Sequence, residues 1–179
     1  KLCRPFDLNR SGVVVGEGAG AIVIEELTHA QKRGATILGE IVGYGSSTVA
    51  SPKGVADCGK AIENVLKQCM RTASLTPEKI GHINAHGLGT HACDAAEAQA
   101  IHRFLGDHEA PVMAPKSYFG NLGAGSGMIE LIASLTAIEK NTLFPILNYE
   151  TPDPDCPIQA SRAGDAPGDY FLNISVSPQ

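Results

Sequence analysis

His86 stands in a glycine-rich turn that could present an imidazole to a substrate. It is followed by Gly87, Gly89 and Thr90. An apolar stretch over residues 80–85 predicts a buried strand that runs into the turn, and the ends of such strands often carry catalytic groups in α/β folds. A lone histidine is more often structural. The glycines favour a catalytic role because they let a substrate come close to the backbone.

A second segment combines a lysine with glycines at the start of a helix. Lys116-Ser-Tyr-Phe-Gly-Asn121 is followed by a glycine-rich stretch up to Gly127, and then by Glu130. Glycines at a helix start expose backbone N–H groups and the positive end of the helix dipole, which can stabilise an anion. They also allow another backbone to pack closely. Both interpretations remain open.

A third glycine cluster, Gly16-Glu-Gly-Ala-Gly20, follows Arg4-Pro-Phe-Asp7. A dinucleotide-binding loop needs a strand before its glycines and a helix after them, whereas here the predicted strand comes after. We therefore expect a tight turn that enters a buried strand, and no cofactor.

A metal site has little support in the sequence. His82 and His86 would need a third ligand, for which His91 or Asp94 could be considered. Asp94 is more simply an acid in the first turn of a helix, where it suits the dipole. We expect no metal.

The elements that must position these residues alternate between strand and helix. We predict strands over residues 19–27, 37–44, 80–85, 112–114 and 170–176, and helices over residues 28–33, 57–73, 94–105 and 126–140. The last helix is apolar on nearly all sides, which is typical of a buried helix. Residues 145–167 are rich in proline and predict a long ordered loop. The alternation predicts an α/β layered fold.

Composition excludes several classes of protein. The chain has 179 residues, enough for one domain with a core, and a formal net charge of −5, which argues against a nucleic-acid partner. No apolar run is long enough to span a membrane, and no signal segment opens the chain. The five cysteines are widely spaced without a C-x-x-C pair, so we expect reduced thiols and a cytoplasmic protein.

Four segments, taken in order, resemble the chain-elongating β-ketoacyl-acyl-carrier-protein synthases, which are thiolase-like condensing enzymes. They are Arg4-Pro-Phe-Asp7 with the glycine cluster, the His86 turn, Lys116-Ser with Gly120, and Glu150-Thr-Pro-Asp-Pro-Asp155. The resemblance implies a thiolase-like half, with a layered mixed sheet and flanking and buried helices. Residues 1–35 would be the tail of the N-terminal half, and residues 36–179 the C-terminal domain without its last strand. The nucleophilic cysteine would lie upstream, and none of the cysteines here is assigned that role.

The resemblance also implies a reaction and a set of residues. The family performs decarboxylative Claisen condensation of an acyl thioester with a malonyl thioester, in fatty acid or polyketide synthesis. Its first histidine, its lysine and its helix glutamate match His86, Lys116 and Glu130. Thr90, Asp94 and Ser175 would support them. An acyl carrier protein would be the partner, and the full-length protein would be a homodimer. Because carrier proteins are acidic, docking would use a basic patch such as Lys60, Lys67 and Arg71.

Three departures from the family pattern bear on activity. Leu88 replaces a threonine, Asn121 replaces the second histidine, and the tail Ile174-Ser-Val-Ser-Pro178 keeps only Ser175. An asparagine amide can donate a hydrogen bond to a thioester oxygen, but it cannot carry a proton at neutral pH. Asn121 is therefore compatible with an initiation-type Cys-His-Asn site. It is equally compatible with a non-catalytic, chain-length-factor-like partner of an active synthase.

Overall fold

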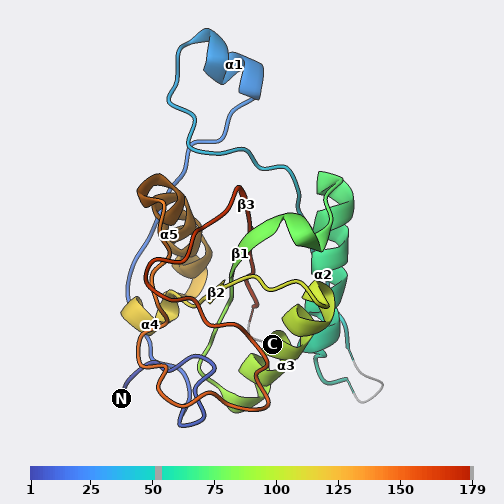
Figure 1. Ribbon diagram of the computed structural model, residues 1–179, viewed down its shortest axis with the longest axis vertical. Coiled ribbons are helices and arrows are strands. Elements are labelled where there is room, and N and C mark those ends of the chain that lie inside the picture. The colour runs from blue at the N-terminus through green and yellow to red at the C-terminus, as the bar shows by residue number, and fades with distance from the viewer. Residues whose placement is uncertain (51–53, 178–179) are drawn as a thin grey trace.

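A small parallel sheet lies at the centre of the structure, a computed structural model that describes residues 1–50 and 54–177. Its strands are β1 (Ile80–Asn84), β2 (Val112–Met113) and β3 (Tyr170–Asn173), in the order β2-β1-β3 (Figure 1). The α/β fold class is confirmed. The expected mixture of strand directions is not found among these strands, because β1 pairs in parallel with both neighbours.

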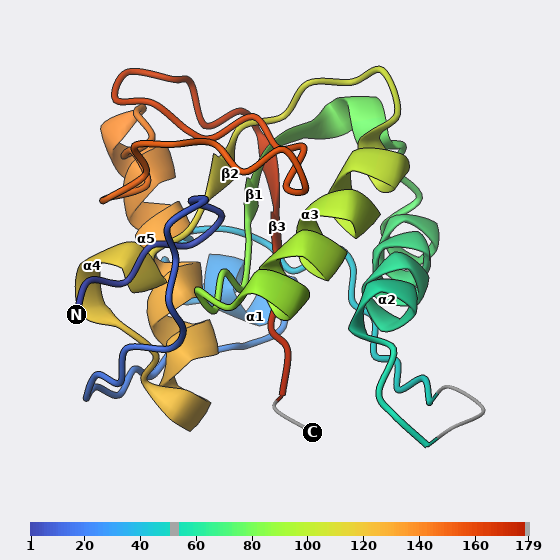
Figure 2. The same ribbon diagram turned by 90° about the horizontal axis from the view of Figure 1, so that it is seen from below.

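Helices cover both faces of this sheet, as Figures 1 and 2 show. On one side α2 (Cys58–Ala73) packs against α3 (His91–Leu105), and on the other lie α4 (Lys116–Phe119) and α5 (Ser126–Lys140). The remaining elements are α1 (Leu27–Lys32) and two short 3-10 helices, η1 (Pro77–Lys79) and η2 (Gly123–Gly125). In the part of the chain that the structure describes, no helix is long and apolar enough to cross a membrane.

The sequence of α2 accounts for its bounds and its orientation. The side chain of Asp57 accepts a hydrogen bond from the backbone N–H of Lys60 at 2.9 Å, which caps the start. Ser74 adopts a left-handed conformation, with φ of 55°, and ends the helix. Ile62, Leu66 and Met70 recur every four residues and are buried. One face of α2 therefore packs into the core, as the helical pattern predicts.

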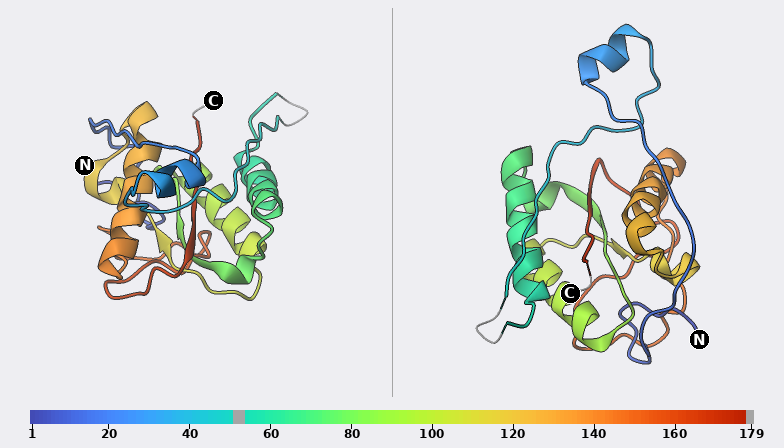
Figure 3. Two further views of the ribbon diagram at one scale, coloured as in Figure 1. Left: turned by 90° about the horizontal axis from the view of Figure 1, so that it is seen from above. Right: turned by 180° about the vertical axis from the view of Figure 1, so that it is seen from behind.

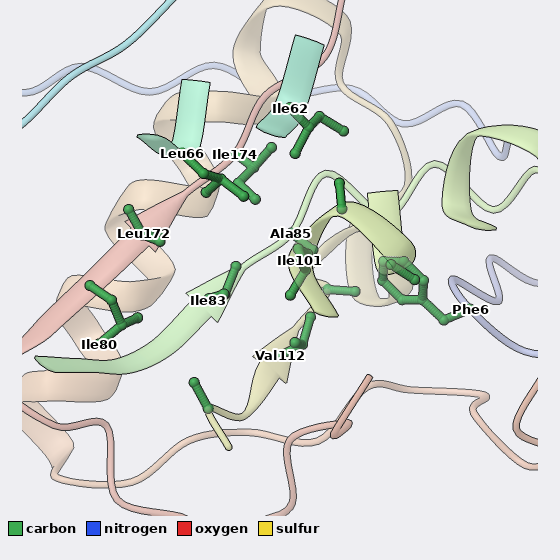
Figure 4. Close-up of a cluster of buried hydrophobic side chains, with 14 of the residues drawn as sticks. Phe6, Ile62, Leu66, Ile80, Ile83, Ala85, Ile101, Val112, Leu172 and Ile174 are labelled. Atoms are coloured by element: carbon green, nitrogen blue, oxygen red, sulfur yellow. The ribbon is translucent and has the colours of Figure 1, made fainter. Parts of the chain in front are cut away.

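The core lies mainly between the sheet and the α2–α3 layer (Figure 4). Ile83 and Val112 point into this cluster, together with Ile101 of α3. Their neighbour Met113 belongs to a second cluster that includes Ala137 of α5. Successive side chains of a strand point to opposite faces, so β2 contributes to both layers.

Helix α5 differs from its prediction, because its buried face is partly polar. Ser126, Glu130 and Ser134, which recur every four residues, are each at most 1% exposed. The apolar side chains on its other faces, among them Met128 and Ile132, are only partly buried. Apolar content indicated burial but did not show which face points inward. The inward face is set by the buried polar partners of these three side chains.

Two predicted strands are not formed. Residues 19–26 and 36–45 are extended segments on either side of α1, which projects from the body of the molecule (Figures 1 and 3). Their apolar side chains are exposed, with Val23 at 88% and Leu38 at 71%. A strand requires a neighbouring backbone to pair with, and within the described residues neither segment has one. Alternation of apolar residues was present in the sequence, but a partner strand was not.

The other elements follow the sequence closely. The short helix α1, the strand β1 and the loop over residues 145–167 lie where they were predicted. Helix α3 begins at His91 rather than at Asp94, and β3 ends at Asn173 rather than near residue 176. Pro178, the last position of the tail that departs from the family pattern, lies outside the described residues.

Candidate active site

The His86 turn begins directly after the central strand β1. Gly87 and Gly89 have φ angles of 52° and 82°, which a side chain would strain. A Cβ atom on Gly87 would also lie 3.1 Å from the Cβ atoms of Pro5 and Ala114, so the turn packs closely against its neighbours. His86 itself is 6% exposed. The glycines thus fold the chain sharply at the carboxyl end of the sheet and place His86 in a buried position.

Two buried carboxylates of α3 hold this turn through its backbone. Glu97 accepts hydrogen bonds from the N–H groups of His86 and Gly87, at 2.7 and 2.9 Å. Asp94 accepts from the N–H groups of Gly89 and Thr90, at 3.0 and 3.3 Å. Burial raises the pKa of Glu97 to about 7, although both N–H groups favour its ionised form. The carboxylates therefore fix the shape of the turn.

The contact of Glu97 with the His86 turn was not predicted from the sequence. A usable signal was present. Asp94 and Glu97 are three residues apart and lie on one face of α3, the face that packs toward the turn. Two buried acids on one face of a helix that follows a glycine turn would have suggested that they bind its backbone.

Lys116 joins the turn to α5. Its ammonium group donates to the carbonyl oxygen of His86 at 2.7 Å and to Nδ1 of His86 at 3.1 Å, and it forms an ion pair with Glu130. The side chains of Lys116 and Glu130 are both fully buried. An ammonium group has three protons, and here they meet three acceptors. Burial raises the pKa of Glu130, and the charge of Lys116 opposes this rise.

This contact determines the state of the His86 ring. Burial and the charge of Lys116 lower the pKa of His86 to about 3, so the ring is neutral near pH 7. Because Lys116 donates to Nδ1, this nitrogen must be the acceptor and the ring proton must reside on Nε2. Within the described residues Nε2 makes no hydrogen bond, so it is free to donate to a ligand.

Asn121 follows α4 and Gly120, whose φ angle is 76°. Its backbone N–H donates to the carbonyl oxygen of Val14 at 2.7 Å, and its own carbonyl oxygen accepts from Gly16 at 3.0 Å. The side-chain oxygen Oδ1 accepts from the N–H of Gly123 at 3.2 Å. The N-terminal glycine cluster therefore approaches the backbone around Asn121 closely.

The N-terminal motif and the residues near 150 hold each other beside the turn. The buried carboxylate of Asp7 accepts from the N–H groups of Glu150 and Thr151, at 2.8 and 2.7 Å. Arg10 forms ion pairs with Asp153 and with Asp94, the residue that also supports the His86 turn. These contacts connect the N-terminal segment and the loop near residue 150 to α3.

Two of the expected supporting residues have weaker links to the site. Thr90 precedes α3, and its hydroxyl is buried without a hydrogen-bond partner in residues 1–50 and 54–177. Ser175 is exposed in the extended segment after β3. A Cβ atom on Gly127 would lie 3.7 Å from its hydroxyl, which places Ser175 beside the start of α5.

The residues considered for a metal site do not gather. His82 stacks on Phe171 with ring centroids 5.1 Å apart, and its Nδ1 lies 2.7 Å from the carbonyl oxygen of Pro167. Asp94 is occupied by backbone N–H groups and Arg10. Among the described residues, no group of three possible metal ligands is found.

Two of the cysteines, Cys3 and Cys156, have the properties of structural thiols. All five are unpaired, and Cys3 and Cys156 are buried. Burial raises the pKa of Cys3 to about 11 and that of Cys156 to about 12, so both are thiols rather than thiolates at neutral pH. Neither has the ionisation that a nucleophile requires.

Comparison with known families agrees with this geometry. The model of the family described as beta-ketoacyl synthase, C-terminal domain, matches residues 38–150. The chain belongs to this family. The 3-oxoacyl-[acyl-carrier-protein] synthase 2 of Coxiella burnetii is 42% identical over 159 residues, which are 87% of this chain and 38% of the relative. Nodulation protein E of Rhizobium meliloti is 40% identical over 177 residues, 98% of this chain and 43% of the relative.

Solved structures show the same ketosynthase fold. The ishigamide ketosynthase/chain length factor superposes with a TM-score of 0.84 at 35% identity, over 94% of this chain and 42% of that one. AntDE:AntF, described as a type II polyketide synthase carrier protein in complex with its ketosynthase, gives 0.84 at 32% identity, over 93% and 42%. The thiolase-like class is thus confirmed. The chain spans about two fifths of the length of these relatives.

Proposed function

We propose that this chain is the C-terminal part of a β-ketoacyl synthase that condenses an acyl thioester with a malonyl thioester. Residues 1–35 would be the tail of the N-terminal half and residues 36–179 the C-terminal domain. The family match, which begins at residue 38, supports this division. Relatives named as fatty acid and polyketide synthases support the reaction class.

The observation that carries the proposal is the set of three acceptors around the ammonium group of Lys116. They are the carbonyl oxygen and Nδ1 of His86 and the carboxylate of Glu130. Because Nδ1 accepts from the lysine, the neutral ring of His86 has its proton on Nε2, which can donate. When the bond between the carboxylate carbon and Cα of the malonyl group breaks, carbon dioxide leaves and negative charge develops on the thioester oxygen. A fixed N–H donor in a buried site stabilises that charge. His86 would be the first donor.

Asn121 would supply the second donor. Its Oδ1 accepts from the backbone, which leaves Nδ2 to donate to the same developing oxygen. The resulting enolate carbon would attack the acyl thioester carbonyl, form the new carbon–carbon bond, and release the thiolate of a cysteine. That cysteine would lie in a part of the protein outside this chain. Glu130, Asp94, Thr90 and Ser175 would have supporting roles.

The partner would be an acyl carrier protein, as the carrier protein complexed with its ketosynthase in the AntDE:AntF structure supports. Lys67 and Arg71 on the exposed side of α2 are candidates to contact it, whereas Lys60 is already paired with Glu63 at 3.3 Å. We further propose a homodimer of the full-length protein in the cytoplasm. The unpaired cysteines support a reducing compartment.

Release of carbon dioxide from a malonyl carrier-protein thioester by the full-length protein tests this function. We expect turnover by the unchanged protein and a loss of about 100-fold or more in His86→Ala, the size expected when a fixed donor is removed. His102→Ala, at an exposed position of α3, is the matched control and should retain full activity. An active His86→Ala variant would contradict the proposed role.

A second candidate function is a non-catalytic partner that shapes the pocket of an active synthase. Asn121 in place of a histidine favours it, as does the likeness to a ketosynthase/chain length factor. A protein with this role would release no carbon dioxide on its own. It would change the length of the product when mixed with an active synthase. The two readouts separate the candidates.

A further inference from the structure

Ser126 is a buried serine at the first position of α5, and its hydroxyl lies against the side chain of Asn121. It is 1% exposed. Its oxygen accepts a hydrogen bond from the backbone N–H of Leu122 at 2.9 Å, and it lies 3.1 Å from Oδ1 of Asn121. The N–H of Gly123 reaches the same Oδ1 at 3.2 Å. Ser126 thus joins Asn121 to the first turn of α5.

Two backbone N–H groups fix the direction of each hydrogen bond in this cluster. A backbone N–H can only donate, so the amide atom that faces Gly123 must be the oxygen of Asn121. The N–H of Leu122 likewise makes the oxygen of Ser126 an acceptor, which leaves the hydroxyl proton for Oδ1. Oδ1 then has two donors for its two lone pairs. The nitrogen Nδ2, bonded to the same Cγ atom and pointing away from Oδ1, is left without one of these partners.

A second serine–asparagine pair on the same helix has the opposite arrangement. Nδ2 of Asn84 donates to the hydroxyl of Ser134 at 3.0 Å and to the carbonyl oxygen of Glu130 at 2.6 Å. The amide nitrogen of Asn84 is therefore fully used within the protein. Nδ2 of Asn121, in contrast, donates no hydrogen bond within residues 1–50 and 54–177, and its residue is only half-buried. Of the two pairs, only the one at Asn121 leaves a donor for a ligand.

We infer that Ser126 is a positioning residue, which turns the amide of Asn121 so that its N–H faces the thioester oxygen of the substrate. This inference rests on the proposed function. It also explains how an uncharged amide can replace a ring at this position, because an amide that is free to flip would also present its oxygen, an acceptor, to the substrate. The hydroxyl of Ser126 and the N–H of Gly123 both favour the single donor-out orientation.

A purely structural role for Ser126 predicts a different outcome. If the hydroxyl served only to accept the N–H of Leu122 at the start of α5, its removal would cost stability whether or not Asn121 were present. If it acts through Asn121, its removal has no effect on catalysis once the amide is gone. A double-mutant cycle between the two positions therefore separates the roles.

The experiment uses the full-length protein and measures carbon dioxide release from a malonyl carrier-protein thioester. We expect Ser126→Ala to slow release about tenfold, the value of one hydrogen bond lost in the transition state. Ser126→Thr, which keeps the hydroxyl, should restore most of the rate. In the Asn121→Ala background, Ser126→Ala should change the rate less than about twofold. Ser134→Ala, the matched control, should lower the melting temperature and leave the rate unchanged.

A binding measurement keeps the test decisive if turnover is absent. The same variants are titrated with a malonyl analogue that has an amide in place of the thioester. A protein that binds the analogue without turnover contradicts the catalytic function. The double-mutant cycle between Ser126 and Asn121, measured as changes in affinity for the analogue, then still tests the positioning role of Ser126. A turnover loss in Ser126→Ala that persists in Asn121→Ala overturns the inference and leaves the function standing. A protein that neither binds nor reacts contradicts both.

Discussion

Lys116 donates a hydrogen bond from its buried ammonium group to Nδ1 of His86 across 3.1 Å. The lysine thereby controls the ring in two ways. In addition to burial, its charge lowers the pKa of the imidazole. Its N–H donates to Nδ1, so the single ring proton of the neutral histidine resides on Nε2. The carboxylate of Glu130 balances the charge of the buried lysine. A donor that stays uncharged and correctly oriented is what a developing enolate oxygen requires.

The first prediction concerns this buried ion pair. Lys116→Met removes the partner of Glu130 and should lower the free energy of unfolding by about 3–5 kcal/mol, because it leaves a buried charge uncompensated. The double variant Lys116→Met with Glu130→Leu should recover most of that stability, since no charge remains unpaired. Neither variant should recover carbon dioxide release, because Nδ1 of His86 has lost its donor. Urea unfolding and the release assay measure the two effects, and an active double variant would contradict the role of the lysine.

The second prediction concerns the donor at Asn121. Asn121→Asp keeps the oxygen that accepts from Gly123 and replaces Nδ2–H with a second, negatively charged acceptor. It should slow carbon dioxide release by about 100-fold or more, because the site would repel the enolate. In Asn121→His, a ring nitrogen can accept the same N–H while the other donates, so activity should be largely retained. If Asn121→Asp were as active as the unchanged protein, Nδ2 would have no catalytic role.

The sequence predicted the glycine turn after β1 and the start of α5 better than the pairing of strands, for a physical reason. Glycine turns and the helix start at Ser126 depend on local chain geometry, which residue types reveal. The two absent strands depend on a backbone partner, and no pattern within residues 19–27 or 37–44 shows whether one exists. Glu97 was underestimated because the acceptor role of a buried carboxylate depends on which N–H groups the fold brings to it. The order of residues along the chain shows neither the partner of a strand nor the N–H groups that will face a buried carboxylate.

The third prediction is a pH dependence of stability. In the folded protein the pKa of His86 is lowered from 6.5 to about 3, whereas the unfolded chain takes up a proton near the ordinary value. Between these two values the unfolded state binds more protons, so stability falls as the pH falls, by at most about 1.4 kcal/mol per pH unit. His86→Gln should lack this contribution. The pKa of His82 is lowered as well, but it is present in both proteins and cancels in the difference.

Urea unfolding of both full-length proteins from pH 7 down to about pH 4 measures this difference. We expect the two stability curves to differ by a constant amount above the ordinary histidine pKa, and the unchanged protein to lose stability relative to His86→Gln as the pH falls below it. Curves that stay parallel over the whole range would show that His86 titrates normally in the folded protein.

The fourth prediction tests the carboxylate that holds the turn. Both oxygens of Glu97 accept backbone N–H groups, those of His86 and Gly87. Glu97→Gln would place an amide NH₂ against one of these donors, and we expect a loss of about 1–3 kcal/mol in the free energy of unfolding. The carbon dioxide release rate should also fall, since the backbone of His86 loses its support. Gln99→Ala, at an exposed position of the same helix, is the control and should change neither quantity by a comparable amount.

The last prediction concerns the contact between Asp7 and the backbone of residues 150 and 151. The carboxylate of Asp7 accepts from the N–H groups of Asn9, Glu150 and Thr151, at 2.8, 2.8 and 2.7 Å. Burial alone would raise its pKa, but these backbone donors together with Arg4 lower it below 3.8. The stabilising contribution is therefore fully present above this ordinary value and is lost as the pH falls through the lower pKa of the folded state.

Asp7→Asn retains only one amide oxygen for these donors, and it should lower the free energy of unfolding at neutral pH by about 2 kcal/mol. Asp169→Asn removes the same charge from an exposed position and controls for net charge. Because Asp7 holds the backbone N–H groups of Glu150 and Thr151, we also expect proteolysis near residue 150 to be faster in Asp7→Asn. If the stability difference between Asp7→Asn and the unchanged protein did not shrink below the ordinary pKa of an aspartate, the pKa of Asp7 would not be lowered in the folded protein. The backbone N–H groups of Glu150 and Thr151 would then not stabilise its charged form.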